Sequence, residues 1–382
     1  MLLAIAFLSA VMAILTTAVL TMAQWKIQRL RTIPIPATEW QAPAVSIIVA
    51  ARNESRDIEQ AMRSLLQLPY KPLQITIVND RSTDETGQIL DRLATEHPRL
   101  NVVHLQSLPD GWLGKNYAQH FGAQRSDGRW LLFTDADIVF QPTALQRAVW
   151  LAEEQGLDHL AATPKVNVQG FLLNALVATF AVFFKAYFRP WRARNPRSKA
   201  FIGIGAFNLV RAEAYQQIGG HERLKMRPDD DVKLGKVLKH SGFSQDFVVA
   251  PDMLSVRWYG SVGELIRGLE KNSFAGVEYN PWTVIASTAT VLLFHVGPFI
   301  GVFLTTGLTQ ILLAIAVGLW WFCCAQACRD FKQSSWYGVG YPVAASLLVY
   351  VQWRTMILNY WLGGIRWRDT FYSLDELRKN RV

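Results

Sequence analysis

The sequence contains few charged residues for its length. Asp, Glu, Lys and Arg together make up 18% of the 382 residues, whereas apolar residues make up 51%. Ordinary soluble domains carry about 25% charged residues. The shortage therefore indicates membrane-embedded segments.

The cysteines and histidines are also not spaced in the way that metal ligands are. The three cysteines, Cys323, Cys324 and Cys328, lie within one apolar stretch, where buried thiols are the expected state. The seven histidines show no metal spacing either, and we interpret them as structural or exposed.

Negative charge is in deficit, because the net charge is +9 and the pI is near 9.5. Such a balance suggests an anionic partner: nucleic acid, a nucleotide phosphate or an acidic bilayer surface. No nucleic-acid fold signature appears, and many basic residues flank apolar runs. We therefore expect the lipid bilayer, and no nucleic acid, as a partner.

Residues 1–25 carry no charge, which is long enough for a spanning helix of about 20 residues. A cleaved signal peptide would have a basic start, and no Lys or Arg precedes Lys26. Lys26, Arg29 and Arg31 follow the segment, so the positive-inside rule places the next residues in the cytoplasm. We predict a retained transmembrane anchor in the cell (inner or plasma) membrane.

A second membrane region is predicted over 283–365. Residues 283–328 are long enough to cross twice, with a turn at Gly307–Gln310. The apolar stretch 339–363 is either a third span or a re-entrant or interfacial segment. We favour a re-entrant segment, since a span would put the basic residues of the predicted cytoplasmic tail, 366–382, outside; these are Arg366, Arg368, Arg378, Lys379 and Arg381.

Between these regions the sequence predicts a linker over 26–42 and a cytoplasmic catalytic domain over 43–282. The run 45–50 is continuously apolar, as in strands buried within a parallel sheet. Strand patterns then alternate with helix patterns up to residue 135. This alternation predicts an α/β fold with a doubly wound, mostly parallel, Rossmann-like sheet.

Polar motifs follow the predicted strands. Ala51-Arg52-Asn53-Glu54 follows the first, Asp80 the second, and Asp135 with Asp137 the strand that begins at Trp130. Ligands of such sheets bind beyond the carboxyl ends of the strands. Two carboxylates one residue apart can hold one hard divalent cation, Mg²⁺ or Mn²⁺, which then neutralises a diphosphate.

Residues 171–199 combine an apolar helix with a basic cluster. The helix pattern over 171–188 contains Lys185, and five basic residues follow it (Arg189, Arg192, Arg194, Arg197 and Lys199). An interfacial helix held to anionic headgroups fits this composition. A buried core helix is the alternative.

Taken in order, the motifs resemble family 2 glycosyltransferases with a GT-A fold. The resemblance spans residues 43–280 and rests on 51–54, 78–84, Gly114-Lys115, 134–137 and the Asp230-Asp231-x-x-Leu234-Gly235 motif. The membrane flanks, Arg257-Trp258-Tyr259 and Lys271-Asn272 are similar to the branch that glycosylates lipids, including ceramide, carotenoid and hopanoid-associated enzymes.

The resemblance implies a role for each residue. Ala51, Arg52 and Glu54 would line the nucleoside pocket, and Asp80 would accept a hydrogen bond from the base. Lys115 would approach the diphosphate, with Arg257 and Trp258 also at the nucleotide-sugar. Asp135 would lie near ribose and metal, and Asp137 would bind the metal. Asp231, with Asp230 beside it, would match the family's catalytic base.

Each role has a structural alternative. Asp80 and Asp84 could cap the helix that begins near Thr83. Asp229–Asp231 could be an acidic first helical turn, favourable with the helix dipole. Lys115 could be solvated, and Arg257-Trp258 could pack at the bilayer surface.

Two motifs depart from the family pattern. The base motif usually reads Glu-Asp, whereas here it is Asp230-Asp231, which keeps the Asp. Processive polysaccharide synthases carry Gln-x-x-Arg-Trp, whereas this chain has Leu254 in place of the Gln. A single transfer is therefore favoured over chain extension.

The resemblance thus implies an inverting, metal-dependent glycosyltransferase that moves one sugar from a UDP-sugar to a hydroxyl of a membrane lipid. UDP-glucose is the first donor to consider, and a glycolipid, sphingolipid or carotenoid the acceptor. Two alternatives stay open: transfer to a polyprenyl phosphate, and a membrane protein that binds nucleotide-sugar without turnover.

Overall fold

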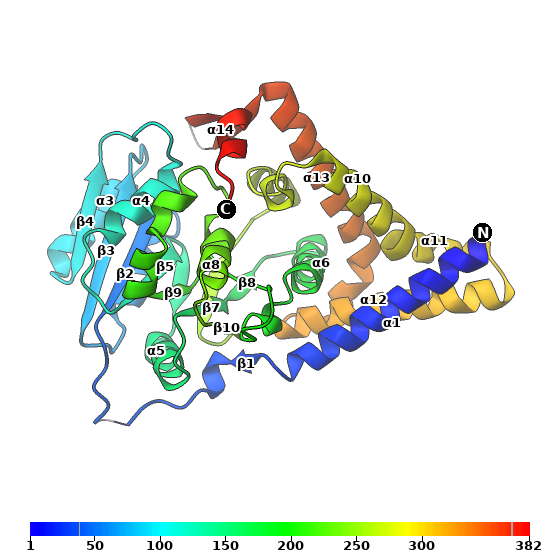
Figure 1. The fold of residues 1–382 in the computed structure, drawn as a ribbon, viewed down its shortest axis with the longest axis horizontal. Coiled ribbons are helices and arrows are strands. Elements are labelled where there is room, and N and C mark those ends of the chain that lie inside the picture. Colours follow the sequence, from blue (N-terminus) through cyan, green and yellow to red (C-terminus); the bar gives the residue numbers. More distant parts are fainter. Residues whose placement is uncertain (38, 368–369) are drawn as a thin grey trace. The chain divides into compact units, whose positions relative to one another are not determined.

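The computed structural model describes residues 1–37, 39–367 and 370–382 (Figure 1). They divide into two compact units. Unit 1 comprises Met1–Lys26, Val168–Arg189 and Trp258–Arg378, and unit 2 comprises Ile27–Asn167, Pro190–Arg257 and Lys379–Val382. The predicted range 43–282 is therefore shared between the units, because residues 168–189 and 258–282 group with unit 1. Arg368 of the predicted tail lies outside the described residues.

An eight-stranded sheet forms the centre of unit 2 (Figure 1). Its order is β1 (Gln28–Arg29), β10 (Gln245–Val249), β7 (His159–Thr163), β9 (Asn208–Arg211), β5 (Trp130–Asp135), β2 (Val45–Ala51), β3 (Leu73–Asp80) and β4 (Leu100–Leu105). All neighbours pair in parallel except β9, which is antiparallel to both β5 and β7. The predicted α/β class with a mostly parallel sheet is confirmed.

Apolar periodicity accounts for the elements of this sheet. In β2 every residue except Ala50 is buried, as expected for a central strand covered on both faces. The following helix, α2 (Ile58–Leu66), buries Ile58, Ala61, Met62 and Leu65, which share one helical face. The other helices of unit 2 are α3 (Thr86–Glu96), α4 (Gly114–Ala123), α5 (Ala144–Glu154), α7 (Ala212–Gln217) and α8 (Asp230–His240).

A smaller sheet of unit 2 joins β6 (Ile138–Phe140), β11 (Leu254–Arg257) and β8 (Lys165–Asn167) in the order β6-β11-β8. Short 3₁₀ helices complete the unit: η1 (Leu30–Thr32), η2 (Pro190–Arg192) and η3 (Gly220–Leu224). β1 and η1 fall inside the predicted linker. Gln28 and Arg29 pair with Val248 and Val249, so this part of the linker belongs to the sheet.

Unit 1 is mainly helical. Its long helices are α1 (Leu2–Gln24), α6 (Phe171–Phe188), α12 (Gly307–Asp330), α13 (Tyr341–Leu362), and a run formed by α10 (Pro281–Thr290), the π-helix η5 (Val291–Val296) and α11 (Gly297–Leu304). The shorter elements are α9 (Val262–Leu269), η4 (Ala275–Val277), η6 (Ser335–Gly340), the hairpin β12 (Gly364–Trp367) and β13 (Thr370–Ser373), and α14 (Leu374–Lys379).

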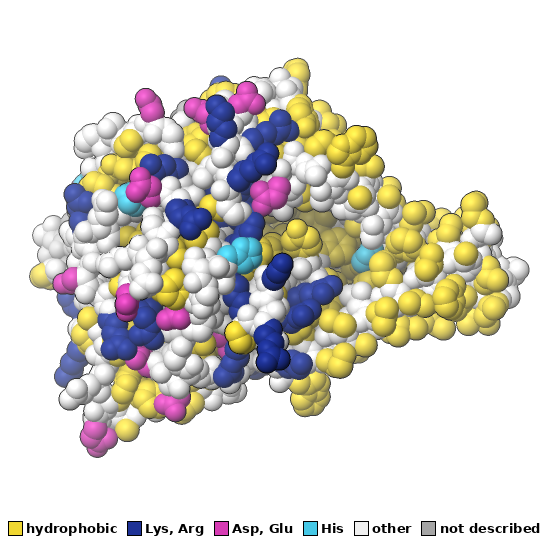
Figure 2. Space-filling model, in the orientation of Figure 1, with side chains coloured by type: hydrophobic (Ala, Val, Ile, Leu, Met, Phe, Trp, Pro, Cys, Tyr) yellow, Lys and Arg dark blue, Asp and Glu magenta, His cyan; other side chains and the backbone are white. Residues whose placement is uncertain are grey.

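Four helices of the described residues are long and apolar enough to cross a membrane: Leu2–Gln24, Phe171–Arg192, Pro281–Leu304 and Gly307–Asp330. Figure 2 shows hydrophobic side chains covering the surface of α1, α11 and α12. The turn between α11 and α12 lies at Thr305–Thr306, just before the turn predicted at 307–310. These helices support membrane association.

Helix α13 runs uninterrupted from Tyr341 to Leu362. Among the described residues it is not one of the four helices that are long and apolar enough to cross a membrane. The re-entrant segment favoured from the sequence stays a prediction.

The π-helix η5 precedes Pro298. In a regular α-helix the Phe294 carbonyl would accept from residue 298, but proline has no N–H. Trp320 Nε1 instead donates to the Phe294 oxygen at 2.9 Å. Helix α12 thus supplies the donor that Pro298 lacks.

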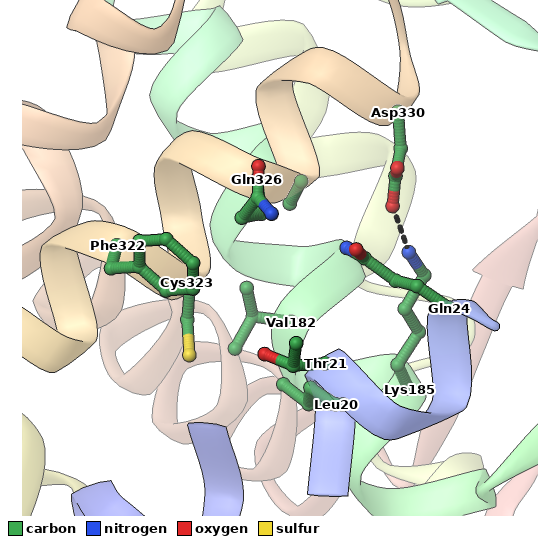
Figure 3. Close-up of a pocket in the computed structure, with 10 residues that line it drawn as sticks. Leu20, Thr21, Gln24, Val182, Lys185, Phe322, Cys323, Gln326 and Asp330 are labelled. Atoms are coloured by element: carbon green, nitrogen blue, oxygen red, sulfur yellow. Dashed lines mark hydrogen bonds and ion pairs between the residues drawn. The ribbon is translucent and has the colours of Figure 1, made fainter. Parts of the chain in front are cut away.

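Helix α6 packs among the other helices of unit 1. Its Lys185 forms an ion pair with Asp330 of α12, with 2.5 Å between Nζ and Oδ2 (Figure 3). The pair lies beside a cavity of about 20 Å³, which is enough for one water molecule. Figure 3 shows Thr21, Gln24 and Gln326 around the same cavity, so polar groups join α1, α6 and α12 at one end. The three cysteines are buried thiols, as predicted.

Candidate active site

Three neighbouring parallel strands deliver the predicted residues to one edge of the sheet in unit 2. β2 lies between β5 and β3, with Ala50 opposite Asp135 and Ala51 opposite Asn79. Because parallel strands end on the same side, Ala51, Asp80 and Asp135 end side by side. Ala51 itself is buried, so it contributes backbone to this edge.

Asp80 is held by two arginines. Arg81 donates to it through Nε at 2.7 Å and Nη2 at 3.2 Å, and Arg52 Nη1 lies 3.4 Å away. Bidentate guanidinium–carboxylate pairs fix the orientation of both groups. The helix-cap alternative fits Asp84, whose Oδ1 accepts from the Thr86 N–H at 3.0 Å in the first turn of α3. The carboxylate of Asp80 is instead bound by the two arginines.

The loops after β2 and β3 are tied together. Ser82 Oγ accepts from the Asn53 N–H at 3.0 Å, and Asn53 Oδ1 accepts from the Thr83 N–H at 2.8 Å. Thr86 Oγ1 accepts from the Glu54 N–H at 2.8 Å. Asn53 and Arg81 both have φ of 54°, a left-handed conformation that non-glycine residues seldom adopt. These bonds hold Arg52, Glu54 and Asp80 in one compact corner.

Lys115 faces the acidic residues from the first turn of α4. Its Nζ lies 2.8 Å from Asp135 Oδ1 and 3.6 Å from Asp230 Oδ2. Burial acts to lower the pKa of Lys115, but the carboxylates of Asp135, Asp230 and Asp231 raise it above its ordinary value. Lys115 is therefore a fixed positive charge. The solvated-lysine alternative is contradicted by these ion pairs.

Asp231 is placed by backbone donors. Gly205 N–H donates to its Oδ2 at 2.7 Å, and Val232 N–H donates to its Oδ1 at 2.8 Å. Burial raises the pKa of Asp231, Lys115 lowers it and Asp135 raises it, and the balance lies above the ordinary value. A carboxylate with a raised pKa is a better proton acceptor near neutrality.

Gly205 also shows how close Asp135 and Asp231 are. A Cβ on Gly205 would lie 2.7 Å from Asp135 Oδ2 and 3.3 Å from Asp231 Oδ2. Both carboxylates therefore border the same small volume. Asp135 and Asp231, nearly a hundred residues apart in sequence, meet there.

Asp229 differs from its two neighbours. It is the N-cap of α8, and its carboxylate receives two hydrogen bonds at 2.8 Å from the buried guanidinium of Arg227. Lys233 Nζ lies 3.7 Å away. Asp230 and Asp231 form the acidic first turn of α8, and they also face Lys115 and Gly205.

Asp137 lies in a negative environment. Burial, followed by the charges of Asp135 and Glu54, raises the pKa of Asp137 to about 7. Crowded carboxylates at a strand end are the oxygen donors that Mg²⁺ or Mn²⁺ prefers. Among the described residues, no group of three or more His, Cys, Asp or Glu side chains is arranged to hold a metal. Metal binding by Asp135 and Asp137 stays a prediction.

Arg257 and Trp258 are neighbours in sequence but belong to different compact units. Arg257 ends β11 in unit 2 and is exposed, and no contact described for unit 2 joins it to the acidic residues. Trp258 belongs to unit 1, where its ring lies 6.0 Å from Phe180 and 4.7 Å from Tyr259. Trp258 thus packs against aromatic rings of its own unit, and its place at the bilayer surface or at the nucleotide-sugar stays a prediction.

Three residues at this site escaped sequence reasoning: Arg81, Asn116 and Arg227. Arg81 and Arg227 hold Asp80 and Asp229, and each lies within two positions of its partner, so proximity in sequence could have suggested them. Asn116 donates to the Arg227 carbonyl at 2.9 Å across more than a hundred residues. No local pattern indicates that contact.

Comparison with known proteins gives a consistent result. Residues 46–219 match the family described as glycosyl transferase family 2. An uncharacterised glycosyltransferase of Escherichia coli, YibD, is 29% identical over 114 residues, which is 30% of this chain and 32% of that protein. The 4,4'-diaponeurosporenoate glycosyltransferase of Staphylococcus aureus is 22% identical over 218 residues, 56% of each chain. This chain thus matches between a third and just over half of the length of these relatives.

A solved structure extends the likeness to the fold. The mannosyltransferase PcManGT from Pyrobaculum calidifontis, in complex with GDP-mannose and Mn²⁺, superposes with a TM-score of 0.55 at 16% identity, covering 94% of this chain and 99% of that one. At this identity the match shows a shared fold.

Proposed function

Because residues 46–219 match glycosyl transferase family 2, we propose that this chain transfers a single sugar from a nucleotide-sugar to a hydroxyl of a membrane lipid. One observation carries the proposal: Lys115, Asp135, Asp230 and Asp231 meet at the carboxyl edge of the sheet. A cation and a proton acceptor side by side are what such a transfer requires.

Asp231 is the proposed base. It takes the proton of the acceptor hydroxyl as the oxygen attacks the anomeric carbon from the face opposite the leaving group. The bond from that carbon to the diphosphate breaks, and the diphosphate keeps the electron pair, so the configuration inverts. The raised pKa of Asp231 and the two backbone donors that orient it suit this task.

Lys115 is the proposed counter-charge for the diphosphate. Its ion pairs with Asp135 and Asp230 hold Nζ in position before substrate arrives. A preorganised charge stabilises developing negative charge without reorganisation. Arg52 and Asp80 would bind the nucleoside, with Ala51 and Glu54 beside them. Arg257 and Trp258 stay predictions of the family resemblance.

Asp135 and Asp137 would hold Mg²⁺ or Mn²⁺. Burial, together with the nearby charges of Asp135 and Glu54, raises the pKa of Asp137, and a bound cation would relieve the repulsion between these carboxylates. When bound, such an ion supplies Lewis-acid stabilisation of the diphosphate. The PcManGT complex contains Mn²⁺, which supports testing manganese first.

The apolar helices support a lipid acceptor. The staphylococcal relative is named for a carotenoid acid, which favours an apolar acceptor held in the membrane. UDP-glucose is the donor to test first, with GDP-mannose beside it because of the structural neighbour. The proposed location is the cell membrane with the active site in the cytoplasm.

The test uses the purified full chain in liposomes made from total lipid extract, with Mn²⁺ and radiolabelled UDP-glucose, UDP-galactose or GDP-mannose. We expect one donor to label a lipid, which mass spectrometry then identifies. Label on a polyprenyl phosphate would replace the hydroxyl acceptor. No transfer and no donor hydrolysis with any donor would support a protein that only binds nucleotide-sugar.

A further inference from the structure

The segment 223–227 leads directly into the acidic residues of the site. It connects the 3₁₀ helix η3 to Asp229 and to α8, which begins with Asp230 and Asp231. Any shift of this segment would move both carboxylates relative to Lys115. Its contacts therefore bear on the geometry of the proposed reaction.

Asn380 forms two hydrogen bonds with the backbone of this segment. Its Oδ1 accepts from the Met226 N–H at 2.9 Å, and its Nδ2 donates to the Arg223 carbonyl at 3.0 Å. One side-chain amide thus occupies a backbone donor and a backbone acceptor three residues apart. Asparagine provides both functions at this length, and alanine provides neither.

The neighbours of Asn380 belong to the same unit. Residues 379–382 are part of unit 2, although the chain before them, through Arg378, is part of unit 1. Lys236 of α8 donates to the Val382 carbonyl at 2.6 Å, and the Val382 side chain packs against the cluster that includes Leu234 and Leu238. Residues 380–382 therefore contact both the segment 223–227 and the helix that follows it.

The segment 223–227 also forms hydrogen bonds with residues at the start of helix α4. Leu113 N–H donates to the Lys225 carbonyl at 2.8 Å, and Asn116 Nδ2 donates to the carbonyls of Leu224 at 2.5 Å and Arg227 at 2.9 Å. Asn116 is fully buried, and it is the neighbour of Lys115. The segment is thus tied both to the element that carries the lysine and to Asn380.

We propose that Asn380 is a positioning residue for glycosyl transfer: its amide holds 223–227 so that Asp230 and Asp231 keep their register with Lys115. This role rests on the proposed function of the site. Asn380 touches no reacting atom and acts through Met226 and Arg223. A misplacement of about 1 Å at a reacting group can cost about a hundredfold in rate.

The test compares Asn380→Ala and Asn380→Asp with the matched control Arg381→Ala, since Arg381 is exposed and adjacent. Asn380→Asp keeps the acceptor for Met226 but places an oxygen opposite the Arg223 carbonyl. We expect Asn380→Ala to lower kcat at least tenfold with the donor KM within twofold, Asn380→Asp to fall between, and Arg381→Ala to match the parent protein.

A second readout does not depend on turnover. Hydrogen–deuterium exchange of the full chain should show faster exchange of the Met226 amide in Asn380→Ala, in a peptide covering 223–229, and unchanged exchange in Arg381→Ala. Unchanged exchange and kcat in Asn380→Ala would overturn the proposal. Loss of donor binding together with kcat in both Asn380 variants would indicate a general structural role and overturn it too. If the parent protein transfers no sugar, the proposed function fails, and the exchange result still decides whether Asn380 holds the segment.

Discussion

Three consecutive aspartates illustrate how much one position matters. Asp229 is paired with Arg227, Asp230 lies near Lys115, and Asp231 accepts from Gly205. The three carboxylates share a chemistry and a segment of chain, yet each has a different partner. Only Asp231 combines backbone orientation with a position beside Asp135, which is why the proposed proton transfer is assigned to it.

Replacement of Asp231 by Asn should remove the proton acceptor while keeping the shape of the side chain. General-base catalysis contributes about 10²- to 10⁴-fold, so we expect kcat for a hydroxyl acceptor to fall by that range with the donor still bound. Transfer rates and donor binding by calorimetry measure the two effects. Asp110→Asn, at an exposed aspartate, is the control. A variant that keeps more than a tenth of parental kcat would contradict the assignment or show an acceptor that is already anionic.

Replacement of Gly205 by Ala should displace the carboxylates of Asp135 and Asp231 without changing either residue. The added methyl group would lie 2.7 Å from Asp135 Oδ2, so the carboxylates must shift. We expect at least a tenfold loss of kcat with little change in the thermal midpoint. Gly276→Ala is the control, because a Cβ there meets nothing within 4 Å. Normal activity in Gly205→Ala would show that the carboxylates can move without consequence.

At the scale of elements, the antiparallel strand β9 has a particular role. It separates β5 from β7 in an otherwise parallel sheet, and the loop before it contains Gly205, which reaches both carboxylates. Asn208 of β9 also accepts a hydrogen bond from the buried His159 of β7 at 2.7 Å, and Gln245 of β10 donates to the other ring nitrogen at 3.0 Å. These side-chain bonds lock three neighbouring strands together and require a neutral imidazole.

The pH dependence of stability should report this neutral histidine. Burial lowers the pKa of His159 to about 4, whereas an unfolded histidine titrates near about 6.5. Both states are neutral above that pH. As pH falls toward 4 the unfolded chain takes up the proton first, so the free energy of unfolding decreases.

The histidine contribution should be on the order of 3 kcal/mol across this range. We expect His159→Gln to have a lower unfolding free energy at pH 7 but a shallower decrease between pH 6.5 and 4. Denaturant titrations in detergent, followed by tryptophan fluorescence, measure both. An equal slope in the two proteins would show that His159 does not stay neutral in the fold.

At the scale of the whole molecule, the chain alternates between a helical unit and a sheet unit. It passes between them at residues 26–27, 167–168, 189–190, 257–258 and 378–379. The predicted interfacial segment spans one of these passages, with α6 in unit 1 and the basic residues after Arg189 in unit 2. Arg192 and Arg197 are exposed, and with the net charge of +9 they provide a candidate surface for anionic lipids.

Charge reversal of Arg192 and Arg197 to Glu should weaken activity that depends on anionic membranes. Each basic residue near such a surface contributes about 1 kcal/mol, so removing two and adding two negative charges should reduce liposome binding at least tenfold. Flotation assays and turnover on liposomes with and without anionic lipid measure this. Lys71→Glu, at an exposed lysine of unit 2, is the control. Equal turnover of the Arg192/Arg197 variant and the parent protein on anionic liposomes would contradict an interfacial role.

Local patterns in the sequence sufficed for the elements and their class. The alternation of apolar runs predicts β2, β3, β4 and β5 and the helices between them, because burial of one face depends on spacing between near neighbours. The acidic motifs at strand ends follow from the same logic, since parallel strands bring their carboxyl ends together.

Partners distant in the chain were beyond such patterns. The antiparallel direction of β9, the grouping of α6 with unit 1, the pairing of Asp229 with Arg227 and the contact of Asn380 with 223–226 depend on how packed elements meet. Spacing along the chain records which face of an element is buried. It does not record which distant side chains come within hydrogen-bond distance. Those contacts set the geometry of the candidate site, and only the tertiary structure shows them.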